Sequence, residues 1–144
     1  MTFGRIQDNQ FILRLERGEE VLSVLKIFCQ DHRIKNASVS GIGSIESPTL
    51  AHYTVDTKKY SEKELVGVYE VTALLGTVAL FEKQPLLHLH ITLGDESMQA
   101  FAGHLVSGTV SATLEVIITV LPSAFEKEHD EEIGLKLYTF PKQK

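Results

Sequence analysis

Three of the chain's six histidines lie in one short stretch, LLHLHITLGDESMQAFAGHL (86–105). His88 and His90 are separated by a single residue in an apolar run, and His104 follows a polar loop. Side chains at positions i and i+2 of a β-strand point to the same face, about 7 Å apart. If 86–93 is a strand, the first two imidazoles therefore lie on one face and can reach the same ion.

The third histidine joins this pair if the polar loop folds the chain into a hairpin. A short loop is expected to pair Leu93 with Gln99, which places His88 opposite His104, and directly opposed residues have Cβ atoms about 5 Å apart. Three imidazoles with one open coordination position are typical of catalytic zinc sites. We therefore predict a zinc site at His88, His90 and His104. The alternative is that they are hydrogen-bonded histidines on a sheet surface, because a one-residue change of register would turn the third one away.

Glu115 is the candidate catalytic residue. It lies in the segment TLEVIITV (113–120), where its neighbours are mostly apolar. An unpaired carboxylate is costly to bury, so this side chain is expected to have a partner. It could accept a hydrogen bond from a ligand imidazole or act as a general base near the metal. The equally open alternative is a glutamate on the sheet surface that pairs with a lysine.

The elements that must position these residues follow from the spacing of apolar side chains. The segment 11–16 alternates like a strand, and from residue 37 onward the period is mostly two, most clearly over 108–122. Between them, one buried helical stripe is expected to contain Val21, Leu25, Phe28, Cys29 and His32. The tail 123–140 has an acidic stretch and a short apolar ending, so a loop and one last strand are expected there. We therefore predict an α+β fold with a mainly antiparallel sheet and one principal N-terminal helix.

Composition narrows the class of protein. The 144 residues fit one domain, expected to span 1–144. Fourteen Lys and Arg against nineteen Asp and Glu give a formal net charge of −5, which disfavours direct nucleic-acid binding. The lone Cys29 has no disulfide partner, and no segment is apolar and long enough for a signal peptide or a membrane span. We expect a cytoplasmic protein without membrane contact.

At these residues the chain resembles a PPC (plants and prokaryotes conserved) domain, which stands behind AT-hooks in plant proteins and alone in bacteria and archaea. The resemblance implies a sheet flanked by a helix and assembly as a homotrimer. More distantly, the histidine pattern is similar to the zinc site of acetolactate decarboxylase-like folds, which again implies His88, His90 and His104. The resemblance covers nearly the whole chain and rests on these segments: RLERGEEVLSVLKIFCQDHRI, ASVSGIGSI, YEVTALLGTV, LHLHITLGD, AGHLVSGTV and LEVIITVL.

The chain departs from the family pattern at three places. Ala102-Gly103 stands where the family usually has Gly-Gly, the segment 67–72 lacks the arginine of plant members, and there is no AT-hook. The resemblance implies a stand-alone PPC-domain protein that is a DNA-associated regulatory or binding module with a metal site, although direct DNA contact is disfavoured. The alternative is a zinc-dependent enzyme for a small anionic or carbonyl-containing substrate, with Glu115 as proton acceptor. A protein partner or a small-molecule ligand is compatible with both.

Overall fold

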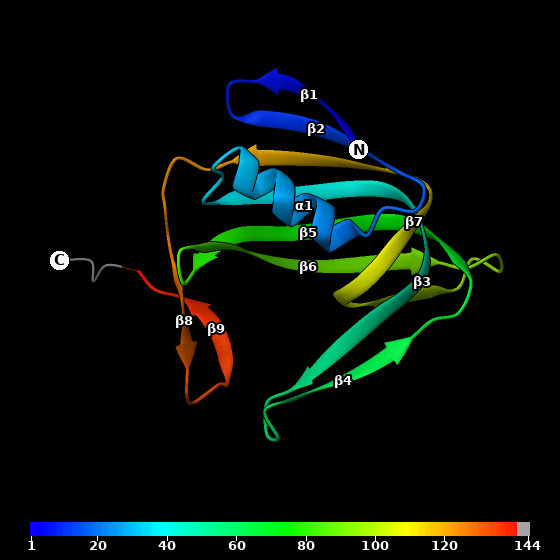
Figure 1. Cartoon of the computed structure of the whole chain (residues 1–144). Helices are drawn as coiled ribbons and strands as arrows, with labels where there is room; N and C mark the ends of the chain where they lie inside the picture. Colours follow the sequence, from blue (N-terminus) through cyan, green and yellow to red (C-terminus); the bar gives the residue numbers. More distant parts are fainter. Residues whose placement is uncertain (141–144) are drawn as a thin grey trace.

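Within the residues described by the computed structural model, alternating apolar and polar residues form nine strands, and one helix lies between the second and third of them (Figure 1). The structure describes residues 1–140, so the last four positions of the expected domain lie outside the described residues. The α+β class with one principal helix is thus confirmed. In chain order the elements are β1 (Thr2–Gln7), β2 (Gln10–Glu16), α1 (Val21–Asp31), β3 (Ala37–Thr54), β4 (Lys59–Glu64), β5 (Val68–Phe81), β6 (Gln84–Gly94), β7 (Ala100–Val120), β8 (Lys127–Asp130) and β9 (Leu135–Tyr138).

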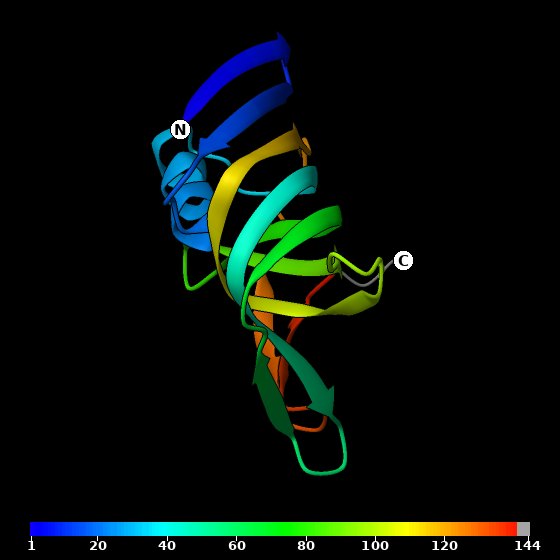
Figure 2. The ribbon, with the colours of Figure 1, turned by 90° about the vertical axis from the view of Figure 1, so that its right-hand side faces the viewer.

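Strands β1 to β7 form one antiparallel sheet in the order β1-β2-β7-β6-β5-β3-β4. The long strand β7 also pairs with β3, so that β3, β5, β6 and β7 close into a ring of paired strands. Bulges in β3 accompany this closure, and Figure 2 shows the resulting curvature of the sheet. Strands β8 and β9 form a separate hairpin.

The core lies between α1 and the inner face of the curved sheet. On the helix, the buried residues are Val21, Leu25, Phe28 and Cys29, as the helical spacing predicts. On the strands, the inward positions include Leu13, Leu89 and Ile91, each at most 2% exposed. The same apolar alternation that fills the core therefore turns the intervening residues of β6 to the opposite face of the sheet.

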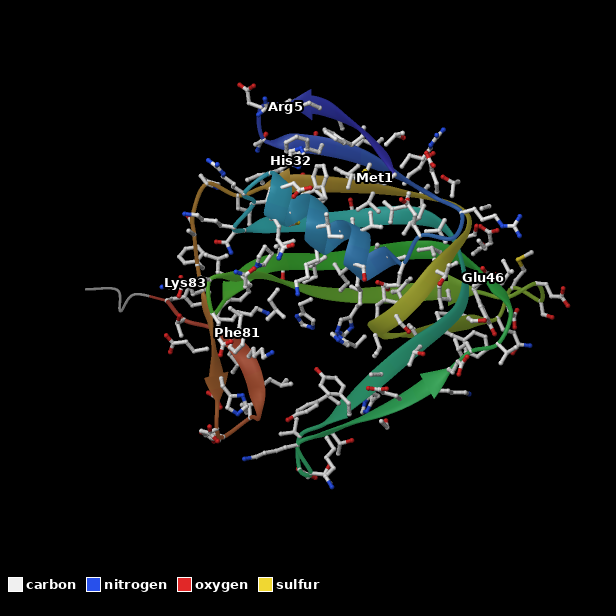
Figure 3. The ribbon with its side chains drawn as sticks, viewed as in Figure 1. Met1, Arg5, His32, Glu46, Phe81 and Lys83 are labelled. Atoms are coloured by element: carbon white, nitrogen blue, oxygen red, sulfur yellow. The ribbon has the colours of Figure 1, made fainter. Side chains whose placement is uncertain are left out.

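The ends of α1 are fixed by side chains at both caps. Glu20 accepts hydrogen bonds from the backbone N–H groups of Leu22 and Ser23. His32 was expected in the buried stripe, but it is the C-cap residue and is exposed, with its ring stacked on Phe28 at 4.1 Å (Figure 3). The helix ends one residue earlier because Arg33 takes a positive φ. Over residues 1–140, no helix is both long and apolar enough to cross a bilayer.

Two elements differ in extent from the sequence prediction. The second arm of the predicted histidine hairpin and the apolar segment 108–122 are one continuous strand, β7, which runs from Ala100 to Val120 and includes His104. The tail was expected to be a loop and one last strand, but it contains the hairpin β8–β9. Its turn is held by Asp130, which accepts a hydrogen bond from the Ile133 N–H, and by Gly134 with φ +80°.

Candidate metal centre

The strand β6 presents its two histidines on the face of the sheet that α1 does not cover. Leu89 is 1% exposed and packs inward, whereas His88 and His90 on either side point outward. Their ring centroids are 5.1 Å apart. The period-two alternation of β6 is therefore the local cause of their proximity.

The third histidine reaches the same place in a different register from the one predicted. Gly94 pairs with Ala100, so that His104 lies opposite His90, and the expected pairing with His88 is wrong. The loop has the expected five residues but begins one residue later, at Asp95, whose carboxylate accepts hydrogen bonds from the Ser97 and Gln99 N–H groups. The partner of His104 is thus displaced by two residues along β6. A displacement by two keeps the side chain on the same face of the sheet, so His104 still points toward His88 and His90.

The three imidazoles converge on one point. Each ring offers one nitrogen, and these nitrogens lie within 4.8 Å of one another. The ring centroid of His104 lies 5.4 Å from that of His88 and 5.5 Å from that of His90. The Nδ1 atom of His104 is buried and has no hydrogen-bond partner within the described residues, which is unfavourable unless another group binds it.

This donor set fits a first-row divalent metal ion. Imidazole nitrogens are suited to zinc and bind it at about 2.0–2.1 Å, so two nitrogens on one ion are at most about 4 Å apart. Small rotations of the rings would close the present separations. An ion at this point would also provide a partner for the buried Nδ1 of His104.

The electrostatics of the site favour neutral imidazoles. Burial, together with the smaller effects of the nearby charges of Lys127, His104 and His90, lowers the pKa of His88 to about 4. Burial and His90 also lower the pKa of His104. Only a neutral imidazole can bind a metal, so both side chains are ready to do so at neutral pH.

The cluster opens into a pocket of about 570 Å³. His88 and His104 lie on one side of the pocket, and the hairpin β8–β9 forms the facing wall. Tyr60 of β4 lies beside the histidines, with its ring centroid 5.4 Å from that of His104. The hairpins β3–β4 and β8–β9 extend past β6 on the same side of the sheet (Figures 1 and 2). They are joined where the Tyr53 hydroxyl donates to the Ile133 carbonyl at 2.6 Å. This contact links the two hairpins.

Sequence analysis did not find the residues of this facing wall. Lys127 and His129 on β8 oppose Tyr138 and Lys136 on β9, so all four share one face of the hairpin and line the pocket. His129 is half-exposed at the rim, where its Nε2 atom lies 3.6 Å from Oε1 of Glu131. The turn sequence around Gly134 was the signal that could have revealed the hairpin.

The remaining candidates lie elsewhere. Glu115 is exposed and in register with Arg14 of β2 and Ile42 of β3, and it lines a different pocket from the histidines. From Glu115, the path along the sheet to His90 crosses β3 and β5, which is about 14 Å at a strand spacing of ~4.8 Å. Within one chain the structure does not bring this carboxylate to the cluster. His52 is exposed and is also outside it.

Comparisons with known proteins agree with this architecture. The model of the Plants and Prokaryotes Conserved (PCC) domain, the family abbreviated PPC above, matches residues 4–122. A "putative dna binding protein" from Bacteroides thetaiotaomicron is 29% identical, with a TM-score of 0.93 and 96% of each chain covered. A PPC protein from Pyrococcus horikoshii is 31% identical, with a TM-score of 0.86 over 99% of this chain and 96% of that one.

A metal-containing protein from Archaeoglobus fulgidus is 29% identical, with a TM-score of 0.85 over 97% of this chain and 99% of that one. A protein similar to α-acetolactate decarboxylase from Staphylococcus aureus is 15% identical and shares the fold, with a TM-score of 0.55 over 77% of this chain and 52% of that one. No curated protein matches the sequence. With the family match over most of its length, and a fold shared from end to end with a PPC protein, the chain belongs to the Plants and Prokaryotes Conserved domain family.

Proposed function

We propose that this protein binds one zinc ion through His88, His90 and His104 and uses it to bind or convert a small molecule. The observation that carries the proposal is the convergence of three imidazole nitrogens on a point that opens into a pocket. A structural zinc site is closed by four protein ligands, whereas three ligands and a pocket leave a position for a substrate. Zinc in such a site supplies a Lewis acid that polarises a carbonyl oxygen.

The chain's own residues prepare the site for this chemistry. The lowered pKa of His88 keeps its imidazole neutral, so that no proton has to be displaced at neutral pH. Residues of both hairpins, Tyr60 of β4 and Lys127 and Tyr138 of β8–β9, line the pocket beside the histidines and are in a position to contact a bound molecule. That the Archaeoglobus fulgidus relative is a metal-containing protein supports metal binding in this chain.

Metal analysis of protein purified without an affinity tag tests this proposal. We expect one zinc per chain, and replacement of His88, His90 or His104 by Ala should lower zinc affinity at least a hundredfold, because two imidazoles hold zinc far less well than three. His52→Ala is the matched control, since this histidine is outside the cluster, and should leave affinity unchanged. Parent-like zinc affinity in His104→Ala would contradict the three-histidine site.

A DNA-associated regulatory role is the second candidate function. It is supported by the description of the Bacteroides relative. Direct contact is disfavoured, because a chain with a net charge of −5 has few groups to replace the counterions of phosphate. We expect no electrophoretic shift of duplex DNA at nanomolar protein and physiological salt. A shift that weakens steeply with added salt would overturn this expectation.

We further propose that the protein acts in the cytoplasm as a homotrimer. Assembly is supported by an apolar patch on the face of the sheet away from α1, formed by the exposed residues Ile12, Ile42 and Leu75. Glu115 borders this patch, so a proton-acceptor role for it would require a neighbouring subunit to place it near a histidine cluster.

A further inference from the structure

The hairpin β8–β9 contributes a buried positive charge to the metal pocket. Lys127 is only 7% exposed, although lysine is among the residues least often buried. Its Nζ atom lies 4.7 Å from the centroid of the Tyr138 ring. Within residues 1–140 it forms no ion pair with a carboxylate. A cation–π contact offsets only part of the cost of removing an ammonium group from water, so this charge lacks a counter-ion.

The rest of the pocket also lacks negative charge. Its lining contains two lysines and three histidines but no aspartate or glutamate, in a chain with nineteen acidic residues. Lys127 lines the same pocket as His88 and His104, which places the ammonium group and the histidine cluster in the same space. Lys136, opposite His129, has its Nζ 4.2 Å from the Phe81 ring centroid, and Figure 3 shows Phe81 beside this hairpin.

Size and apolar surface restrict the class of anion. A volume of about 570 Å³ suits a small molecule and excludes a polymer from the interior. Apolar and aromatic side chains make up much of the remaining lining, including Leu86, Leu137 and Tyr138. Of the two lysines in this lining, Lys127 is buried and Lys136 is exposed. A single buried ammonium group beside apolar surface matches a monoanion with a hydrophobic body.

We propose that Lys127 binds the carboxylate of a small organic acid whose apolar part fills the pocket between the histidine cluster and β8–β9. This inference deepens the proposed function, on which its role in a reaction rests, by naming the substrate class. The hairpin lies beyond residues 4–122, which the family model matches, so the family pattern does not define this half of the site.

Calorimetric titration with benzoate, benzamide and inorganic phosphate tests the proposal, on both chelator-treated and zinc-loaded protein. Benzamide has the shape of benzoate without its charge, and phosphate has charge without an apolar body. We expect the parent to bind benzoate at least tenfold more tightly than either of the others. No preference for benzoate, or no benzoate binding at millimolar concentration, would overturn the proposal.

Lys127→Met removes the charge and keeps the length of the side chain. It should lower benzoate affinity at least tenfold and leave benzamide binding and zinc stoichiometry unchanged, whereas Lys127→Arg should retain benzoate binding. Lys26→Met, on the exposed side of α1, changes the net charge equally and should have no effect. Parent-like benzoate affinity in Lys127→Met would refute the assignment. If the parent protein binds no zinc but still prefers benzoate, the metal proposal alone would be refuted.

Discussion

At the scale of single residues, burial selects which groups carry charge. Burial, and to a smaller extent the nearby His90, lowers the pKa of both His88 and His104 and so favours their neutral form. Burial also lowers the pKa of Lys127, although its reference value is far above neutral pH. Neutral imidazoles and a cationic lysine in one pocket are what a site needs to hold a metal ion at one end and an anion at the other.

At Cys29, burial makes a side chain less reactive. It is fully buried in the core, and burial raises the pKa of its thiol to about 12. The thiolate is the reactive form, so the native thiol should react with iodoacetamide at pH 8 at least a hundredfold more slowly than the urea-unfolded chain. Mass spectrometry of the alkylated protein measures both rates. Native alkylation as fast as that of the unfolded chain would show that Cys29 is accessible and available for chemistry.

At the scale of elements, the strand β5 sets the position of β6 and its histidines. Gly76 of β5 pairs with Leu89, and a Cβ atom at Gly76 would lie only 2.0 Å from the His88 carbonyl oxygen. Only a residue without a side chain allows the two backbones to approach this closely. The position of the β6 backbone at His88 therefore depends on the glycine at position 76 of the neighbouring strand β5.

Gly76→Ala should therefore lower the free energy of unfolding by about 1–3 kcal/mol, because the strand must shift to admit a methyl group. Zinc affinity should fall with it, since His88 moves relative to His90. Gly94→Ala, at the end of β6, is the control, because a Cβ there meets nothing closer than Thr72 at 3.8 Å. Urea titration and zinc titration measure both effects, and equal behaviour of the two variants would contradict this account.

The elements also show what the sequence could and could not predict. Alternation in β6 predicts that its two histidines share a face, and this survives a register error of two residues. The exact register depended on how Asp95 closes the loop, which apolar spacing does not encode. The pairing of β7 with β3, which separates Glu115 from the histidines, is a long-range contact without a local pattern. Lys127 was missed for the same reason, because its site exists only after β8–β9 folds against β6.

At the scale of the whole molecule, the face of the sheet away from α1 carries an exposed apolar surface among the described residues. A row of directly paired residues crosses that face from Ile12 through Ile117, Ser40 and Leu75 to His90. Ile12 and Leu75 are 39% and 58% exposed. The metal site thus borders an apolar surface of the kind that oligomeric proteins bury against a second copy.

The proposed trimer can be tested on this face with two isoleucines of similar exposure. Ile42 on the apolar patch is 59% exposed, and Ile27 on α1 is 56% exposed. In Ile42→Lys the new ammonium group lies opposite Glu115, and this pairing of opposite charges stabilises the folded monomer. In a trimer the same ammonium group would have to be buried in an apolar interface, which is costly. Sedimentation equilibrium should therefore give a trimer for the parent and for Ile27→Lys, and a monomer with a near-parent melting temperature for Ile42→Lys. A parent that is monomeric at micromolar concentration would refute the trimer. A trimeric Ile42→Lys would show that the subunits meet through another surface.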